Sequence, residues 1–356
     1  MRWWHALPAM LLVAAANPAA IPPRLPDYAV VRPGVSLEFP RDHGAHPAFR
    51  TEWWYVTGWL RTADGRDLGF QITFFRTRPQ VDQANPSAFA AKQVLFAHAA
   101  VSIPANGRLL HDQRIARVGF GLAEARVGDT DIILDDWKML RSKDGIFHAR
   151  VHGQGFALDL ALTPTQAEIL QGKQGYSQKG PLPSEASHYY SMPHLKVSGS
   201  AGALGRVTGT AWLDREWSST LLNPRAVGWD WLGLNMDDGG ALTLFQVRDA
   251  KGHPVWAGGS WRRADGVQTA LGPRDVTFVP GRQWRSVRTG ARYPVAPMVI
   301  IILRGKSLKL NVTPLFDDQE LDSRRGGGPV YWEGAVKVPG GRGYLELTGY
   351  QAALKM

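Results

Sequence analysis

Hydrophobic and polar residues alternate with a period of two along most of the chain, a pattern typical of strands. Asp-Gly and Asn-Gly dipeptides, which favour tight hairpin turns, separate these segments at short intervals. We therefore expect an all-β protein, a sandwich or a closed barrel, with one modest helix at residues 87–93. The expected strands include 67–76, 92–103, 130–139, 145–153, 156–164 and 295–303, with turn dipeptides at 64–65, 106–107, 144–145, 238–239 and 265–266.

The segment TEWWYVTGWL, residues 51–60, has no face suited to water. Side chains alternate along a strand, so the even-numbered positions from Glu52 and the odd-numbered positions from Trp53 both need cover. We expect one face to fill a barrel and the other to meet a second domain. Glu52 lies among aromatic side chains, so its carboxyl group must be hydrogen-bonded, paired with an arginine or protonated.

Two sequence signatures occur once in each half of the chain, in the same order, which indicates an internal duplication. A tryptophan-rich strand leads into an Asp-Gly hairpin at residues 52–76 and again at 229–248. A second hairpin contains Tyr190 or Tyr331, each followed six positions later by Lys-Val and then by a closing Thr-Gly. We place the boundary in the loop-like stretch 218–225. This gives an N-terminal domain over 33–220 and a C-terminal domain over 225–356.

Composition limits the class of protein. The 356 residues include no cysteine, so disulfides and thiol nucleophiles are excluded. The formal charge of +10 is compatible with nucleic acid or an anionic membrane surface. Because the arginines are scattered singly, we expect no nucleic-acid binding and retain peripheral membrane contact as the alternative.

Residues 1–20 have the pattern of a secretory signal peptide. Arg2 precedes an apolar stretch over 6–16 that ends in small residues. Cleavage after Ala16 or Ala20 would release a periplasmic or secreted protein. An uncleaved membrane anchor is the alternative interpretation.

Neither metal ligation nor serine hydrolysis is expected. His43 and His46 share a turn, and His148 and His152 share a strand face, but neither pair has a third ligand at a recognised spacing. The sequence contains no Gly-x-Ser-x-Gly nucleophile motif. We therefore expect no metal site.

The strings HPAFRTEWWYVTG, HYYSMPHLKVSG, GTAWLDREW, GWDWLGL and YWEGAVKV occur in this order. Together they resemble the family that contains bacterial carotenoid 1,2-hydratases and AttH-like secreted proteins, from Pro33 to Gln351. The resemblance implies two tandem lipocalin-like (calycin-type) antiparallel β-barrels packed together. It also implies addition of water to a terminal double bond of an acyclic carotenoid, without a cofactor.

The same resemblance implies that Asp214 donates the proton. Trp212 stands where the family pattern has a tyrosine, and in the element that begins at His188, Tyr190 stands where it has a tryptophan. These two departures affect which substrate the resemblance implies, and they do not affect the fold that it implies. The expected catalytic residues are Asp214, His188, Tyr190 and Trp212, and the expected ligand-binding residues are Glu52, Trp54, Glu216, Trp217, Trp229, Asp230 and Trp231.

The residues themselves suit acid catalysis. Alternation places Trp212, Asp214 and Glu216 on one strand face, with the two acids about 6.6 Å apart along the strand. Protonating an unactivated alkene needs a carboxylic acid that apolar surroundings keep neutral, while a second, ionised carboxylate positions a water. Tryptophan and tyrosine π faces, from Trp212, Trp217, Trp229 or Tyr190, could stabilise the cation. The alternative is a salt-linked strand end without catalytic function.

Two further candidates have structural alternatives. Asp230 shares a face with Leu232 and Leu234, so we favour a structural acid that accepts hydrogen bonds over a catalytic one. His188 could orient Asp214 or a water, although a lone histidine is more often a satisfied structural group.

The leading hypothesis is a secreted hydratase that binds a long apolar ligand, such as an isoprenoid or a lipid, and needs no cofactor. The main alternative is a non-catalytic carrier of the same ligand in the periplasm, in which the aromatic residues line a cavity. A third interpretation is a domain of a periplasmic assembly that works with membrane transport components.

Overall fold

The computed structural model describes residues 25–220, 222–303 and 305–354, so the expected signal peptide at 1–20 lies outside the described residues. The fold is all-β, with 57% strand and 4% helix, which confirms the predicted fold class. No helix in the described ranges is long and apolar enough to cross a membrane. The described helices are 3-10 turns: η1 (Arg41–His43), η2 (Pro104–Asn106), η3 (Gly202–Leu204) and η4 (Arg324–Gly326).

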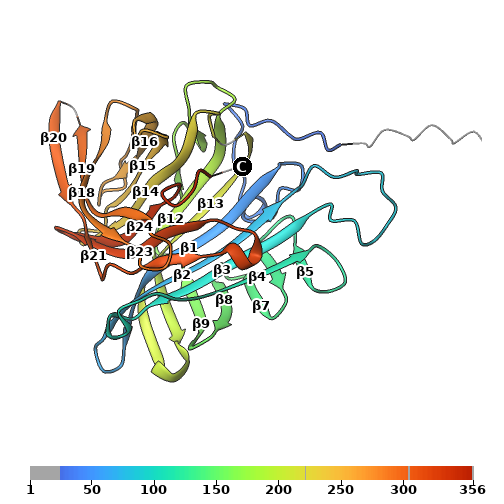
Figure 1. The fold of residues 1–356 in the computed structure, drawn as a ribbon, viewed down its shortest axis with the longest axis horizontal. Helices are drawn as coiled ribbons and strands as arrows, with labels where there is room; N and C mark the ends of the chain where they lie inside the picture. The colour runs from blue at the N-terminus through green and yellow to red at the C-terminus, as the bar shows by residue number, and fades with distance from the viewer. Residues whose placement is uncertain (1–24, 221, 304, 355–356) are drawn as a thin grey trace, which may run out of the picture.

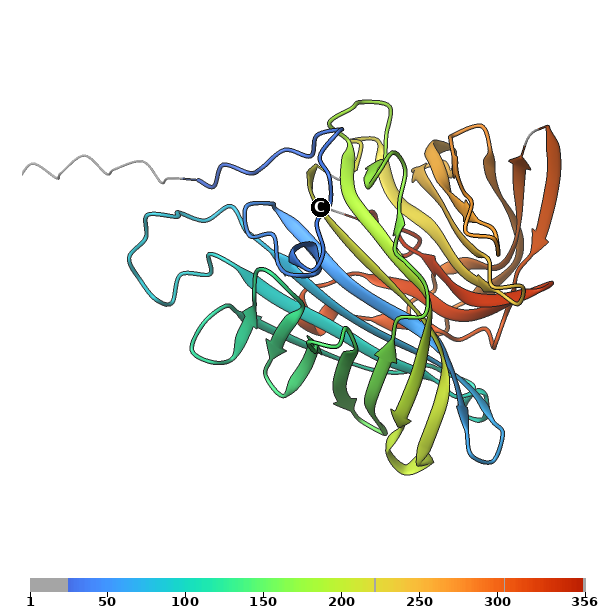
Figure 2. The ribbon, with the colours of Figure 1, turned by 180° about the vertical axis from the view of Figure 1, so that it is seen from behind.

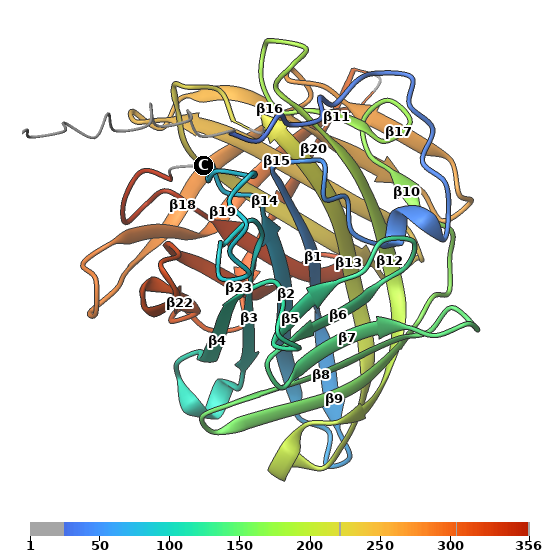
Figure 3. The ribbon, with the colours of Figure 1, turned by 90° about the vertical axis from the view of Figure 1, so that its right-hand side faces the viewer.

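The first unit is a single antiparallel sheet of 13 strands, ordered β4-β3-β2-β1-β13-β12-β9-β8-β7-β6-β5, with β10 and β11 paired to β12. The sheet curls into a nearly closed barrel (Figure 3). An isolated bridge between Gly119 and Ala123 joins the segment after edge strand β4 to edge strand β5. Its strands are β1 (Thr51–Thr62), β2 (Asp67–Thr77), β3 (Val94–Ser102), β4 (Leu110–Arg117), β5 (Ala123–Ala125), β6 (Asp131–Leu134), β7 (Trp137–Arg141), β8 (Phe147–Gly153), β9 (Phe156–Thr163), β10 (Ile169–Leu170), β11 (Tyr176–Gln178), β12 (Ala186–Ser200) and β13 (Arg206–Thr220).

The second unit consists of an eight-stranded sheet and the three-stranded sheet β18-β19-β20, which share one hydrophobic core. The two units share one arrangement of neighbouring strands. In the first unit β1 lies between β2 and β13, and in the second unit β14 lies between β15 and β24. The units pack side by side (Figures 1 and 2). The strands are β14 (Ala226–Met236), β15 (Ala241–Asp249), β16 (Pro254–Arg262), β17 (Gln268–Leu271), β18 (Val276–Arg285), β19 (Arg292–Leu303), β20 (Lys306–Asn311), β21 (Thr313–Pro314), β22 (Glu320–Asp322), β23 (Val330–Val338) and β24 (Gly341–Leu347).

Strand β1 contributes to two cores. Its even-numbered face, with Trp54 and Val56, packs inside the first unit. Its odd-numbered face, with Tyr55 and Trp59, joins a cluster that includes Trp231 of the second unit. The Trp59 indole also donates a hydrogen bond to a carbonyl of β24, at 3.0 Å. The prediction that one face fills a barrel and the other meets a second domain is confirmed.

Two local predictions were wrong. Residues 87–93 form no helix: Ser87 and Phe89 donate their backbone N–H groups to the side chains of Asn85 and Ser87, which compete with helical hydrogen bonds in so short a segment. The single strand expected at 130–139 is instead the hairpin β6–β7. Asp135, at its turn, adopts a φ of 57°, a left-handed conformation that aspartate tolerates better than most residues.

Candidate active site

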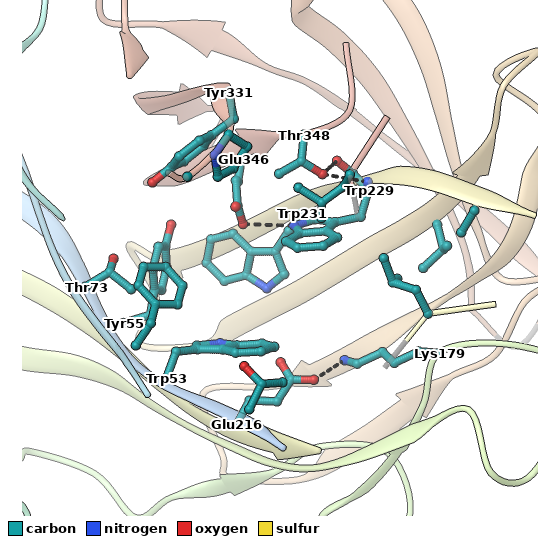
Figure 4. A pocket seen from close by; sticks show the side chains of 18 of the residues that line it. Trp53, Tyr55, Thr73, Lys179, Glu216, Trp229, Trp231, Tyr331, Glu346 and Thr348 are labelled. Atoms are coloured by element: carbon teal, nitrogen blue, oxygen red, sulfur yellow. Dashed lines mark hydrogen bonds and ion pairs between the residues drawn. The ribbon is translucent and has the colours of Figure 1, made fainter. Parts of the chain in front are cut away.

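A cavity of about 760 Å³ lies between the two units. Its walls are the outward face of the first sheet and the facing side of the second unit's large sheet (Figure 4). A cavity of this size is within the range that encloses most of a drug-sized ligand. The first unit contributes Trp53, Tyr55, Thr73, Phe75, Asp214 and Glu216, and the second contributes Trp229, Trp231, Phe245, Tyr331, Glu333 and Glu346, among others.

Strand registers bring the acids of this cavity together. In the first unit Tyr55 on β1 is the direct cross-strand partner of Asp214 on β13. In the second unit Glu346 on β24 lies between Trp231 and Glu333, which are its partners on β14 and β23. Directly opposed residues have Cβ atoms about 5 Å apart. Carboxyl groups of both units therefore converge on one aromatic cavity.

Asp214 is the best-placed acid. Its Oδ1 accepts hydrogen bonds from Ser191 at 2.5 Å and from the Trp212 indole at 2.7 Å, and its Oδ2 accepts one from Tyr189 at 2.8 Å. Burial raises the pKa of Asp214 to about 7, although these three hydrogen bonds act in the opposite direction. The Tyr189 hydroxyl in turn accepts from the Trp231 indole at 3.1 Å, which links Asp214 to the second unit. Asp214 is thus a carboxyl group that can hold a proton at neutral pH.

Glu216 lies two residues further along the same face and is paired differently. The Lys179 ammonium lies 3.0 Å from its Oε1, and Ser187 donates a hydrogen bond to the same oxygen. Figure 4 shows this ion pair on one wall of the cavity. Asp214 therefore has no cationic partner among the described residues, whereas Glu216 is paired with Lys179. Lys179 was not singled out from the sequence.

Glu333 and Glu346 are functional candidates that the sequence analysis missed. Burial raises the pKa of Glu346 to about 7, against a hydrogen bond from the Trp229 indole at 3.0 Å. Burial, and then the neighbouring Glu346, raise the pKa of Glu333 well above its ordinary value. The signal for both is an acid at a cavity-facing position of the strings YWEGAV and GYLEL, but it becomes specific only when the strands are paired.

Four expected site residues lie in the interior of the first unit. Trp54, Tyr190 and Trp217 belong to its core, and Glu52 is fully buried beside them. Glu52 pairs with the guanidinium groups of Arg76 and Arg215. Burial alone would raise the pKa of Glu52, but Arg215, His46 and Arg76 hold it below its usual range. None of the four is among the described residues that line the cavity.

The aromatic members of this group have structural partners. The Trp54 indole donates to the carbonyl of His43 at 2.9 Å, and the Tyr190 hydroxyl lies 2.6 Å from Nδ1 of the same histidine. Trp217 stacks on His46 with ring centroids 3.8 Å apart. The structure does not bring Tyr190 or Trp217 to Asp214's side of the sheet, because alternation along β12 and β13 turns them inward.

Of the remaining candidates, His188 and Asp230 are not among the described residues that line the cavity. His188 packs against Phe49, and burial lowers its pKa to about 4. Asp230 faces the core of the second unit and is paired with Arg248, whose Nε lies 2.9 Å away. Trp212 reaches the site through its hydrogen bond to Asp214, whereas Trp229 and Trp231 line the cavity itself.

Within the described ranges no three His, Cys, Asp or Glu side chains are grouped so as to hold a metal ion. His152, one of the histidines considered above, instead pairs with Asp136 at 2.5 Å.

The fold and the site define an all-β protein of two packed units with an acid-lined aromatic cavity between them. The sequence model of the AttH-like family matches residues 30–350. The chain therefore belongs to the AttH-like family.

One solved structure agrees with this assignment, and two others share the fold. A crystal structure named as an AttH protein, from Nitrosomonas europaea, is 54% identical, with a TM-score of 0.83 over 90% of this chain and 99% of that one. Kievitone hydratase from Nectria haematococca shares the fold at 14% identity, with a TM-score of 0.62 over 91% and 96% of the two chains. CghA in complex with Sch210972 is 12% identical, with a TM-score of 0.50 over 84% and 89%. The search among curated protein sequences found no match.

Proposed function

We propose that the protein is a cofactor-free hydratase that adds water to a carbon–carbon double bond of an apolar ligand held in the cavity between the units. The observation that carries the proposal is Asp214, a buried carboxyl group with a pKa of about 7 at the wall of an aromatic cavity. A general acid is most effective when its pKa lies near the working pH. We propose Asp214 as the proton donor.

The proposed reaction has two steps. The Asp214 proton moves to one alkene carbon, which leaves a tertiary carbocation and an Asp214 carboxylate. Water then forms a C–O bond to the cation and loses a proton to a carboxylate of the site, and exchange with solvent restores the starting protonation. The π faces of Trp53, Trp229 and Trp231, which line the cavity, would stabilise the cation.

One protein name among the comparisons bears on the choice of hydration among acid-catalysed reactions. One protein of the same fold is named a hydratase, kievitone hydratase. At 14% identity the likeness shows the fold alone, so the argument rests on Asp214 and the cavity. The proposal of an exported hydratase rests further on the signal-like residues 1–20.

A carrier function is the second candidate, because aromatic side chains line much of the cavity. One experiment separates the two. The mature protein is incubated with farnesol or geranylgeraniol in ¹⁸O-labelled water, and the products are examined by mass spectrometry. Labelled hydrated product supports the hydratase. Tight binding of these isoprenoids and of lipids that co-purify with the protein, without any labelled product, would support the carrier instead.

The pH dependence of turnover provides a further test. Because the folded pKa of Asp214 is raised to about 7, its proton-donating form prevails below pH 7 and is lost above it. We expect kcat to fall about tenfold per pH unit above pH 7. Initial rates between pH 5.5 and 9 measure this profile. A rate that rises through pH 7 would exclude Asp214 as the acid.

A further inference from the structure

Among the residues that the structure describes, two buried polar groups at the wall of the cavity have no hydrogen-bond partner. They are the hydroxyl of Tyr55 and the Oε1 of Glu333, and the two side chains are 7% and 1% exposed. Buried polar atoms are nearly always paired, because an unpaired one costs about 1–3 kcal/mol. Both residues line the cavity. In Figure 4 the Tyr55 phenol reaches from the first unit toward Tyr331 and Glu346 on the second.

The network behind Glu333 determines what its free oxygen can do. The Gln71 amide donates to Glu333 Oε2 and to the Tyr331 hydroxyl, the latter at 3.3 Å. The Tyr331 hydroxyl lies 2.9 Å from Nδ1 of His98, whose pKa burial lowers to about 3, so we assign the Tyr331 proton to that neutral imidazole. Glu333 Oε2 thus acts as an acceptor, and Oε1 has no hydrogen-bond partner among the described residues.

We assign Glu333 the role of a proton donor at this position. It is directly opposed to Glu346 on β24, and burial together with this neighbour raises its pKa well above its ordinary value, which favours the protonated form. With Oε2 accepting from Gln71, the carboxylic proton belongs on Oε1. Tyr55 also stays protonated, because burial raises its pKa well above 10. Two O–H groups therefore belong to residues of the cavity wall, and the phenol lies near enough to Glu333 to lower its pKa against the effect of burial, although no hydrogen bond joins them.

We propose that Tyr55 and Glu333 together bind one carbonyl oxygen of the ligand, at the part of the cavity next to Asp214. A carbonyl oxygen accepts two hydrogen bonds and brings no proton of its own, so it pairs both donors at once. A tyrosine beside a protonated carboxylic acid is an arrangement that holds a carbonyl or enolate oxygen in other enzymes. The inference rests on the proposed function and deepens it, because it specifies an apolar alkene that also carries a carbonyl group.

A binding experiment tests this without turnover. The two probes are geranylacetone, a ketone built on isoprene units, and the hydrocarbon in which a CH₂ group replaces its carbonyl. Dissociation constants come from quenching of the tryptophan fluorescence, since Trp53, Trp229 and Trp231 line the cavity. We expect Tyr55→Phe to reduce the preference for the ketone by about 2- to 10-fold, the contribution of one hydrogen bond. The carbonyl stretch of ¹³C-labelled ketone should also move to higher frequency in this variant.

Tyr293→Phe is the matched control. Tyr293 is a buried phenol of the second unit's core that donates to Glu320 at 3.0 Å. Loss of the Tyr293 hydroxyl should lower Tm and leave the ketone preference unchanged. Tyr55→Phe should not lower Tm, because the Tyr55 hydroxyl has no hydrogen-bond partner in the described part of the chain. If Tyr55→Phe prefers the ketone as strongly as wild type does, or if its carbonyl stretch is unshifted, the inference is overturned. Ketone discrimination without any hydration would instead contradict only the proposed function.

Discussion

Asp214→Asn should lower the rate at which the alkene substrate is hydrated by about 10²- to 10⁴-fold, the usual contribution of a general acid. An amide occupies the same volume and can still accept from Ser191 and from the Trp212 indole, but it has no acidic proton to transfer. Ligand affinity should therefore change little. Product formation measured by mass spectrometry, together with dissociation constants from tryptophan fluorescence, separates the two effects.

Asp159→Asn is the control for this substitution. Asp159 lies on β9 of the first unit, is 55% exposed and pairs with Arg150 at 2.7 Å on the surface. The same change of acid to amide should leave turnover unaltered there. Turnover by the Asp214→Asn protein at the wild-type rate would contradict the proposed role, and lost turnover together with lost binding would indicate a structural one.

Thermal unfolding gives a second readout for Asp214. Its pKa rises from 3.8 in the unfolded chain to about 7 in the fold, so the folded state holds the proton more tightly. The stability that this provides is fully present below pH 3.8 and is lost as pH rises through 7. Because asparagine does not ionise, we expect the Tm of Asp214→Asn relative to wild type to rise between pH 4 and pH 8.

The fold could be predicted to a large extent because its signals are local. Alternation fixes which side chains share a face, and the doubly apolar segment at 51–60 requires cover on both sides, which β1 receives from two cores. The hairpin β6–β7 could not be found in this way. Its turn uses Asp135 and Asp136 without a glycine, so the segment resembles one continuous strand.

The site was less predictable because it depends on strand register and on distant segments. Alternation correctly put Asp214 and Glu216 on one face of β13. Whether that face points into the barrel or toward the second unit is decided by the pairing of Asp214 with Tyr55, and a slip of one residue would reverse it. Lys179 and Glu333 join the cavity from segments far away in the sequence, and no local pattern connects them to Asp214.

The barrel side of the same strand pair has the opposite electrostatic arrangement. There Glu52 accepts from the guanidinium groups of Arg76 and Arg215, and these side chains are 1% and 0% exposed. Arg215 also lies over the Trp54 ring, 3.6 Å from its centroid. Two buried cations therefore depend on one carboxylate, which is fully charged because the arginines hold its pKa low against the effect of burial.

Glu52→Gln should lower the free energy of unfolding by about 3–5 kcal/mol, because it leaves two buried guanidinium charges without their counterion. Urea unfolding followed by tryptophan fluorescence measures the loss. Asp159→Asn again serves as the control, since an exposed ion pair contributes at most about 1 kcal/mol. A loss below 1 kcal/mol in Glu52→Gln would show that backbone carbonyls alone hold these arginines.

The Glu52 contribution also depends on pH. Because the folded pKa of Glu52 is lowered, its contribution to stability is present above the unfolded pKa and is lost as pH falls. The difference in stability between wild type and Glu52→Gln should therefore shrink on acidification. This slope is opposite to the one expected for Asp214, and the two faces of the β1–β13 pair can therefore be distinguished by their pH dependence alone.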